Sequence, residues 1–148
     1  MFSKIDFGDC VYTFTKSQTY KLQRLQLSAC SFVCNKYVSK KDLIRINWLP
    51  IKERKEFNLL KLVFKALHFK YWPDMNRLKL RTFNRTLRNS NDTLIEITQE
   101  RDSFQFNAYN LFNNLPKDIR NINGEDSYNQ FCSLTKQHLM NIARNEII

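Results

Sequence analysis

Glycine is almost missing from this chain of 148 residues, which contains only Gly8 and Gly124. A glycine-rich phosphate loop or a dinucleotide-binding turn needs several glycines close together, so both kinds of nucleotide site are excluded. So few glycines also argue against an all-β fold with many tight turns. The composition therefore favours a mainly α-helical protein.

Long apolar runs are also missing. No stretch approaches the roughly 18 apolar residues of a membrane-spanning helix. The first ten residues, MFSKIDFGDC, are charged and lack the apolar centre of a secretory signal peptide. We therefore expect an intracellular protein, in the cytoplasm and/or the nucleus, without a membrane partner. Its cysteines are expected to be free thiols.

Residues suited to metal binding or catalysis are few and scattered. Cys30 and Cys34 would share one helix face, but a zinc site usually needs about four ligands in two close pairs. Acidic pairs such as Glu53 and Glu56 have no setting in which they would converge on divalent ions. We interpret the two cysteines as small core residues. The sequence predicts no metal site, no cofactor and no catalytic residue.

The chain is basic, with a net charge of +10, and the charge is concentrated in its middle. Residues 36–88 contain fifteen basic and four acidic side chains, a net charge of +11. Residues 1–35 carry a net charge of +2, and residues 89–148 carry −3. A concentrated basic segment is typical of nucleic-acid binding. The alternative is the solvated surface of a basic protein.

Hydrophobic periodicity predicts a first helix over about 18–34, capped by Ser17. The residues expected to face the core are Leu22, Leu25, Ala29 and Phe32, with Leu27, Cys30 and Cys34 widening that face. Residues 35–50 are predicted to connect this helix to the next.

The strongest helix is predicted over 51–70, directly after Trp48, Leu49 and Pro50. Proline suits the first turn of a helix, where its missing N–H has no partner in any case. Trp48 and Leu49 are expected to anchor this start in the core. One face of the helix is apolar and the other is basic. The basic row consists of Arg54, Asn58, Lys61, Lys65 and His68.

The rest of the chain predicts a loop over 74–92, a short strand over 93–98 and two further helices. One is capped by Ser103 and ends at Pro116. The other begins at Asp126 or Ser127 and extends to about 145. Its inward residues are expected to be Tyr128, Phe131, Leu139 and Ile142. The fold class is mainly α: a compact helical domain of about four helices over 1–148, with a possible short β-hairpin.

Nucleic-acid contact is the chemistry with positive support, because cations and aromatic side chains alternate after the basic row. Such a mixture combines phosphate contacts with stacking on unpaired bases. The candidate contact residues are Arg54, Lys61, Lys65, His68, Lys70, Arg77, Lys79, Arg81, Arg85 and Arg88. The interleaved aromatic residues are Phe69, Tyr71, Trp72 and Phe83, for which core packing is the alternative.

Several stretches, in chain order, match one family pattern. They are IDFGDCVY at 5–12, KLQRLQLSACSFV at 21–33, INWLPIKERKEFNLLKLVFKALH at 46–68, RTLRNSND at 85–92, FQFNAYNLFNNLPKDIR at 104–120 and SYNQFCSLTKQHL at 127–139. Together they resemble the thumb and post-thumb tail of reverse transcriptases from LINE-type (non-LTR) retrotransposons. The structural signature of the resemblance consists of Trp48, Leu49, Pro50, Leu111, Phe112, Asn113, Leu115 and Pro116.

The chain departs from the family pattern at Phe112, where the family has Trp, and at Leu27 and Ser31, where it has Asn and Arg. The family's Tyr-x-Asp-Asp catalytic loop is not in the chain. The resemblance therefore implies a diverged or truncated copy with a thumb-like helix within 1–35.

As the resemblance implies, the chain would be a non-catalytic C-terminal fragment of an RNA-directed DNA polymerase. It would bind template-primer duplex or element RNA, with an upstream polymerase core as partner in a longer protein. The alternative is a structural or protein-interaction domain, or a folded relic with no retained activity. The oligomeric state is left open.

Overall fold

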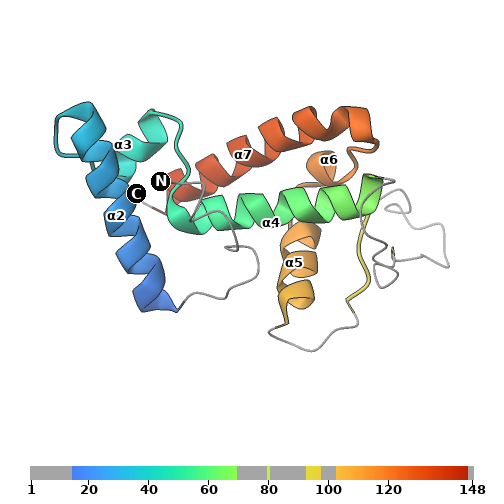
Figure 1. Ribbon diagram of the computed structural model, residues 1–148. Coiled ribbons are helices and arrows are strands. Elements are labelled where there is room, and N and C mark those ends of the chain that lie inside the picture. The colour runs from blue at the N-terminus through green and yellow to red at the C-terminus, as the bar shows by residue number, and fades with distance from the viewer. Residues whose placement is uncertain (1–14, 70–79, 81–92, 98–102, 147–148) are drawn as a thin grey trace. The chain divides into compact units, whose positions relative to one another are not determined.

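The computed structural model describes residues 15–69, 80, 93–97 and 103–146 (Figure 1). These residues form six α-helices and one short 3-10 helix and include no strand. The prediction of a mainly α fold is therefore confirmed. The chain divides into two compact units. One consists of Met1–Asn58 and Lys136–Ile148, and the other of Leu59–Thr135. The single domain expected over 1–148 stays a prediction.

The first unit begins with α2 (Lys16–Cys34), which starts at Thr15 and not at Ser17 as predicted. The Thr15 hydroxyl accepts a hydrogen bond from the Gln18 N–H, and the Gln18 side chain accepts one from the Thr15 N–H. This reciprocal capping box satisfies two N–H groups that the helix itself leaves free. The helix ends at Asn35, whose backbone is left-handed with φ of 48°.

The buried face of α2 is only partly the predicted one, since Cys30 was expected there and Gln26 was not. Gln26 and Cys30 are buried, whereas Leu25 and Phe32 are exposed. Cys30 belongs to a core cluster with Val38 and Leu43, which lies in α3 (Lys40–Arg45). Leu27, Cys34 and Trp48 pack against this cluster. The prediction was wrong for Leu25 and Phe32, because contacts with later segments, not the strongest hydrophobic stripe, select the inward face.

Two long helices each contribute residues to both units. The helix α4 (Ile51–His68) begins in the first unit and continues in the second, and α7 (Tyr128–Asn145) passes from the second unit into the first. In the second unit the rings of Phe64 and Phe131, both fully buried, stack with centroids 4.3 Å apart.

The second unit also contains α5 (Phe104–Asn113), α6 (Lys117–Arg120) and the 3-10 helix η1 (Glu125–Ser127). The predicted cap is confirmed, because the Ser103 hydroxyl accepts a hydrogen bond from the Phe106 N–H. The prediction for Pro116 was wrong. The helix α5 ends at Asn113, and the Pro116 carbonyl accepts the first hydrogen bonds of α6, from Ile119 and Arg120. Proline therefore precedes a helix here, as Pro50 does before α4.

The predicted strand over 93–98 forms only one antiparallel bridge, between Ile95 and Leu80, within the described residues. The Asn113 side chain takes the place of a second strand. It accepts from the Ile95 N–H and donates to the Ile95 carbonyl, both at 2.9 Å. A side chain occupying both backbone groups leaves Ile95 no ladder to extend on that edge.

The remaining differences concern helix ends and one buried face. The helix α4 ends at His68 and not at 70, and η1 precedes α7. Ile142 is 36% exposed and was wrongly placed inward, because Met140 and Ala143 turn to the buried side instead. The predicted loop at 74–79 and 81–92 lies outside the described residues.

Candidate nucleic-acid interface

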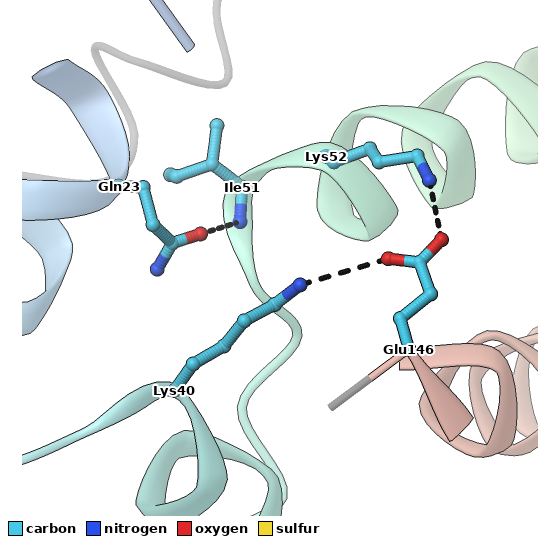
Figure 2. Close-up of polar contacts among 5 residues, drawn as sticks. All are labelled: Gln23, Lys40, Ile51, Lys52 and Glu146. Atoms are coloured by element: carbon cyan, nitrogen blue, oxygen red, sulfur yellow. Dashed lines mark hydrogen bonds and ion pairs between the residues drawn. The ribbon is translucent and has the colours of Figure 1, made fainter. Parts of the chain in front are cut away.

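Two glutamines of α2 hold the start of α4 in the first unit. Gln23 accepts a hydrogen bond from the Ile51 N–H at 3.0 Å (Figure 2). Gln26 donates to the Leu49 carbonyl at 2.9 Å, and Gln23 donates to Gln26 at 2.9 Å. The Ile51 N–H is one of the donors that a helix start leaves without an internal partner. The chain thus caps α4 with a side chain from another helix.

Packing and backbone hydrogen bonds position the triplet Trp48, Leu49 and Pro50. Leu49 and Pro50 are buried, and Trp48 packs against the cluster of Cys30, Val38 and Leu43. The Pro50 carbonyl accepts a hydrogen bond from the Arg54 N–H at 2.8 Å. This triplet sets where α4 begins and therefore which way its basic residues point.

An ion cluster ties the first turn of α4 to α3 and to the end of α7 (Figure 2). Glu146 lies 2.7 Å from the Lys52 ammonium and 3.7 Å from that of Lys40. The hydrogen bond from Lys52 lowers the pKa of Glu146, and the same bond raises the pKa of Lys52. All three side chains are partly exposed, so solvent screens the pairs and their contribution to stability is small. Two cations of the basic segment are thus occupied by a carboxylate.

In the second unit, side-chain hydrogen bonds to the backbone hold the signature residues between Leu111 and Pro116. Besides Ile95, Asn113 is contacted by Arg120, whose guanidinium donates to the Asn113 carbonyl. Asn121 accepts from the Thr93 N–H at 3.0 Å. Phe112 and Leu115 are buried, and Leu111 is half-buried. The signature residues here bind backbone and fill core space, and Pro116 starts α6.

The charged and ionisable residues of the predicted basic row are half-buried. Arg54 lies in the first unit, and Lys61, Lys65 and His68 lie in the second; all four are partly covered. The Lys65 ammonium is 5.2 Å from the centroid of the Tyr128 ring, a cation–π contact. Row residues thus combine side-chain packing with charge.

His68 packs against an aromatic ring. Its ring lies against Phe64 with centroids 4.5 Å apart, and its Nε2 atom is buried without a hydrogen-bond partner. Burial lowers the pKa of His68, which keeps the ring neutral near pH 7. A neutral imidazole supplies no charge for a phosphate. The further candidates Lys70, Arg77, Lys79, Arg81, Arg85 and Arg88 lie outside the described residues.

Metal ligands do not gather in the part of the chain that the structure describes. Cys30 and Cys34 approach to 3.9 Å between sulfur atoms, and burial raises the pKa of the Cys30 thiol. Glu53 is fully buried, and neither of its carboxyl oxygens has a hydrogen-bond partner. These groups are not joined in one site. Among the described helices, none combines the length and apolar character needed to cross a membrane.

Sequence reasoning missed a group of exposed cations outside the predicted row. They are Lys16, Lys21, Arg24, Lys36 and Lys41. The available signal was the absence of any Asp or Glu from Thr15 to Lys41, a stretch with six basic residues. In comparisons with protein-family models, curated proteins and solved structures, nothing matches the chain.

Proposed function

We propose that the chain is a non-catalytic nucleic-acid-binding module, related to the thumb and tail of LINE-type reverse transcriptases. The observation that carries the proposal is the charge of residues 36–88, a net +11 between segments of +2 and −3. Phosphate neutralisation by such a segment releases counterions and favours binding. The bound species would be template-primer duplex or element RNA, and in a longer protein the module would follow a polymerase core.

Mutual contacts between the quoted sequence stretches support the proposal. Gln23 and Gln26, in the stretch at 21–33, bind the backbone of Leu49 and Ile51 in the stretch at 46–68. Such contacts are expected if these stretches belong to one inherited framework. In this framework the glutamines position α4, and the cations after Pro50 provide the binding charge.

A salt titration tests the proposal. Wild type and single Ala variants of Lys61, Lys65, Arg81 and Arg85 are titrated with labelled RNA and with an RNA/DNA duplex. We expect each lost phosphate contact to reduce the slope of log affinity against log salt by about 0.7–0.9.

Lys117→Ala and Arg144→Ala are matched controls, because each removes one cation outside the basic segment. Their slopes should equal that of wild type. Wild-type chain that binds no RNA or duplex at low salt would contradict the proposal, as would slopes unaffected by all four variants.

A second candidate function is that of a protein-interaction domain. The observation that favours it is the set of large apolar side chains exposed around α2. Monomeric proteins rarely expose such side chains in contiguous groups without a binding role.

A further inference from the structure

The helix α2 carries an apolar row that is only partly covered, because Leu22 and Ala29 are half-buried while Leu25 and Phe32 are exposed. Leu22, Leu25, Ala29 and Phe32 follow each other at steps of three, four and three residues, which is the spacing of a helix-pairing seam. Leu25 is 50% exposed and Phe32 89%, and the adjacent Val33 is 73% exposed. Most of the large exposed hydrophobic residues in the described chain lie between Tyr20 and Tyr37.

The row cannot turn inward without breaking contacts that hold the other face. Gln26 is 2% exposed and hydrogen-bonded to the Leu49 carbonyl, and Gln23 caps Ile51. Cys30 packs in the cluster with Val38 and Leu43. Rolling the helix to bury Phe32 would leave buried amide and carbonyl groups without partners, which is unfavourable. The exposed row is therefore a stable feature of the fold.

The basic side chains of the stretch around the row favour a partner of opposite charge. From Thr15 to Lys41 there is no acidic residue. Five cations of this stretch are exposed, and no ion pair joins them to acidic groups of the described residues. A second copy of the chain would bring cations against cations, which disfavours self-association. An acidic partner would be attracted by these charges.

We propose that this face of α2 docks an acidic amphipathic helix of a partner protein. The partner helix presents apolar side chains at steps of three and four residues to Leu22, Leu25, Ala29 and Phe32. Asp and Glu residues beside its apolar row face Lys21 and Arg24. Helix pairing is favoured over a flat surface because the row follows one seam for about three turns. The proposal is independent of nucleic-acid binding by residues 54–88.

The test uses the whole chain and synthetic peptides of about three heptads with Leu at a and d. One peptide has Glu at e and g, and its twin has Lys there. Fluorescence anisotropy should detect binding of the Glu peptide and weaker binding of the Lys peptide. Leu25→Ser combined with Phe32→Ser should weaken binding of the Glu peptide by about tenfold or more. Both positions are exposed, so circular dichroism should show an unchanged fold.

Two further variants sharpen the test. Ile142→Ser replaces an exposed apolar residue of α7 and should leave the affinity unchanged. Lys21→Glu combined with Arg24→Glu should reverse the preference between the two peptides. Equal affinity of wild type and the double serine variant for the Glu peptide would refute the proposal.

Other occupants would also refute it. One such result is that the chain binds phosphatidylserine vesicles or single-stranded RNA but neither peptide. The double serine variant would then lose this vesicle or RNA binding. Another is a wild-type dimer in analytical ultracentrifugation that the same variant converts to monomer. Loss of RNA binding in the basic-segment variants with peptide binding intact would separate this proposal from the nucleic-acid function.

Discussion

Two side-chain amides, those of Gln26 and Asn113, bind backbone groups of segments far away in the sequence. Gln26 donates to the Leu49 carbonyl, 23 residues later, and Asn113 bonds both backbone groups of Ile95, 18 residues earlier. Each amide substitutes for a backbone partner that a ladder or helix would supply. At the scale of single residues, these two amides therefore hold the fold together, while the basic side chains remain the candidates for binding.

Gln26→Leu tests the framework role. Leucine has a similar size but cannot donate to the Leu49 carbonyl or accept from Gln23, so buried polar groups lose their partner. We expect the free energy of unfolding to fall by about 1–3 kcal/mol, measured by urea denaturation. Gln137→Leu, at an exposed site on α7, is the control and should change it by less than about 0.5 kcal/mol. Equal stability of the two variants would contradict the role of the Gln26 amide.

At the scale of elements, asparagine replaces glycine where the chain must turn. Asn35 ends α2 and Asn47 precedes Trp48, with φ of 48° and 60°. Among the other residues with side chains, Asn and Asp adopt this left-handed backbone most readily. The turn at Asn47 lets its neighbour Trp48 return to the cluster beside α2, with the Trp48 N–H bonded to the Leu43 carbonyl at 2.9 Å.

Substitution of Asn47 tests this turn. Asn47→Val places a β-branched residue at positive φ and should destabilise the fold by about 1–2 kcal/mol. Asn47→Gly is the matched variant, because glycine adopts the same backbone without steric cost, and its stability should stay close to that of wild type. Thermal unfolding followed by circular dichroism measures both. If valine were tolerated as well as glycine, the left-handed turn would not be required.

At the scale of the whole molecule, burial of its ionisable groups links stability to pH. The chain has two histidines, and burial lowers the pKa of both His68 and His138. The unfolded chain therefore binds protons at a higher pH than the folded chain, and stability falls as pH drops below about 6.5. Burial raises the pKa of Glu56, which acts in the opposite direction, because its protonated form is favoured in the fold.

Replacing His68 by Phe should flatten this dependence. The phenyl ring can keep the contact with Phe64 and removes the buried, unpartnered Nε2 atom. Between about pH 7 and pH 5, one such histidine contributes a slope of at most about 1.4 kcal/mol per pH unit. Urea denaturation across this range should show a shallower decline for His68→Phe, with the share from His138 retained. An identical slope in wild type and variant would mean that His68 does not titrate in this range.

Local chemistry in the sequence located the four long helices to within a few residues of their ends. Pro50 and Ser103 mark helix starts, and hydrophobic periodicity gives the length of α4 and α7, because these signals act within a few residues. The preference for a mainly α fold followed from the rarity of glycine. The basic row follows from helical spacing alone, and its role in binding stays a prediction.

Only the tertiary structure decided which faces are buried. Leu25 and Phe32 belong to the most apolar row of α2 and are exposed, whereas Gln26 and Cys30 are buried. Periodicity alone cannot distinguish a row that packs against the chain itself from one that stays exposed. The choice depends on the pairing of Gln23 and Gln26 with backbone groups 28 and 23 residues away. Those contacts exist only once the helices have come together, and hydrophobic spacing within one helix does not contain them.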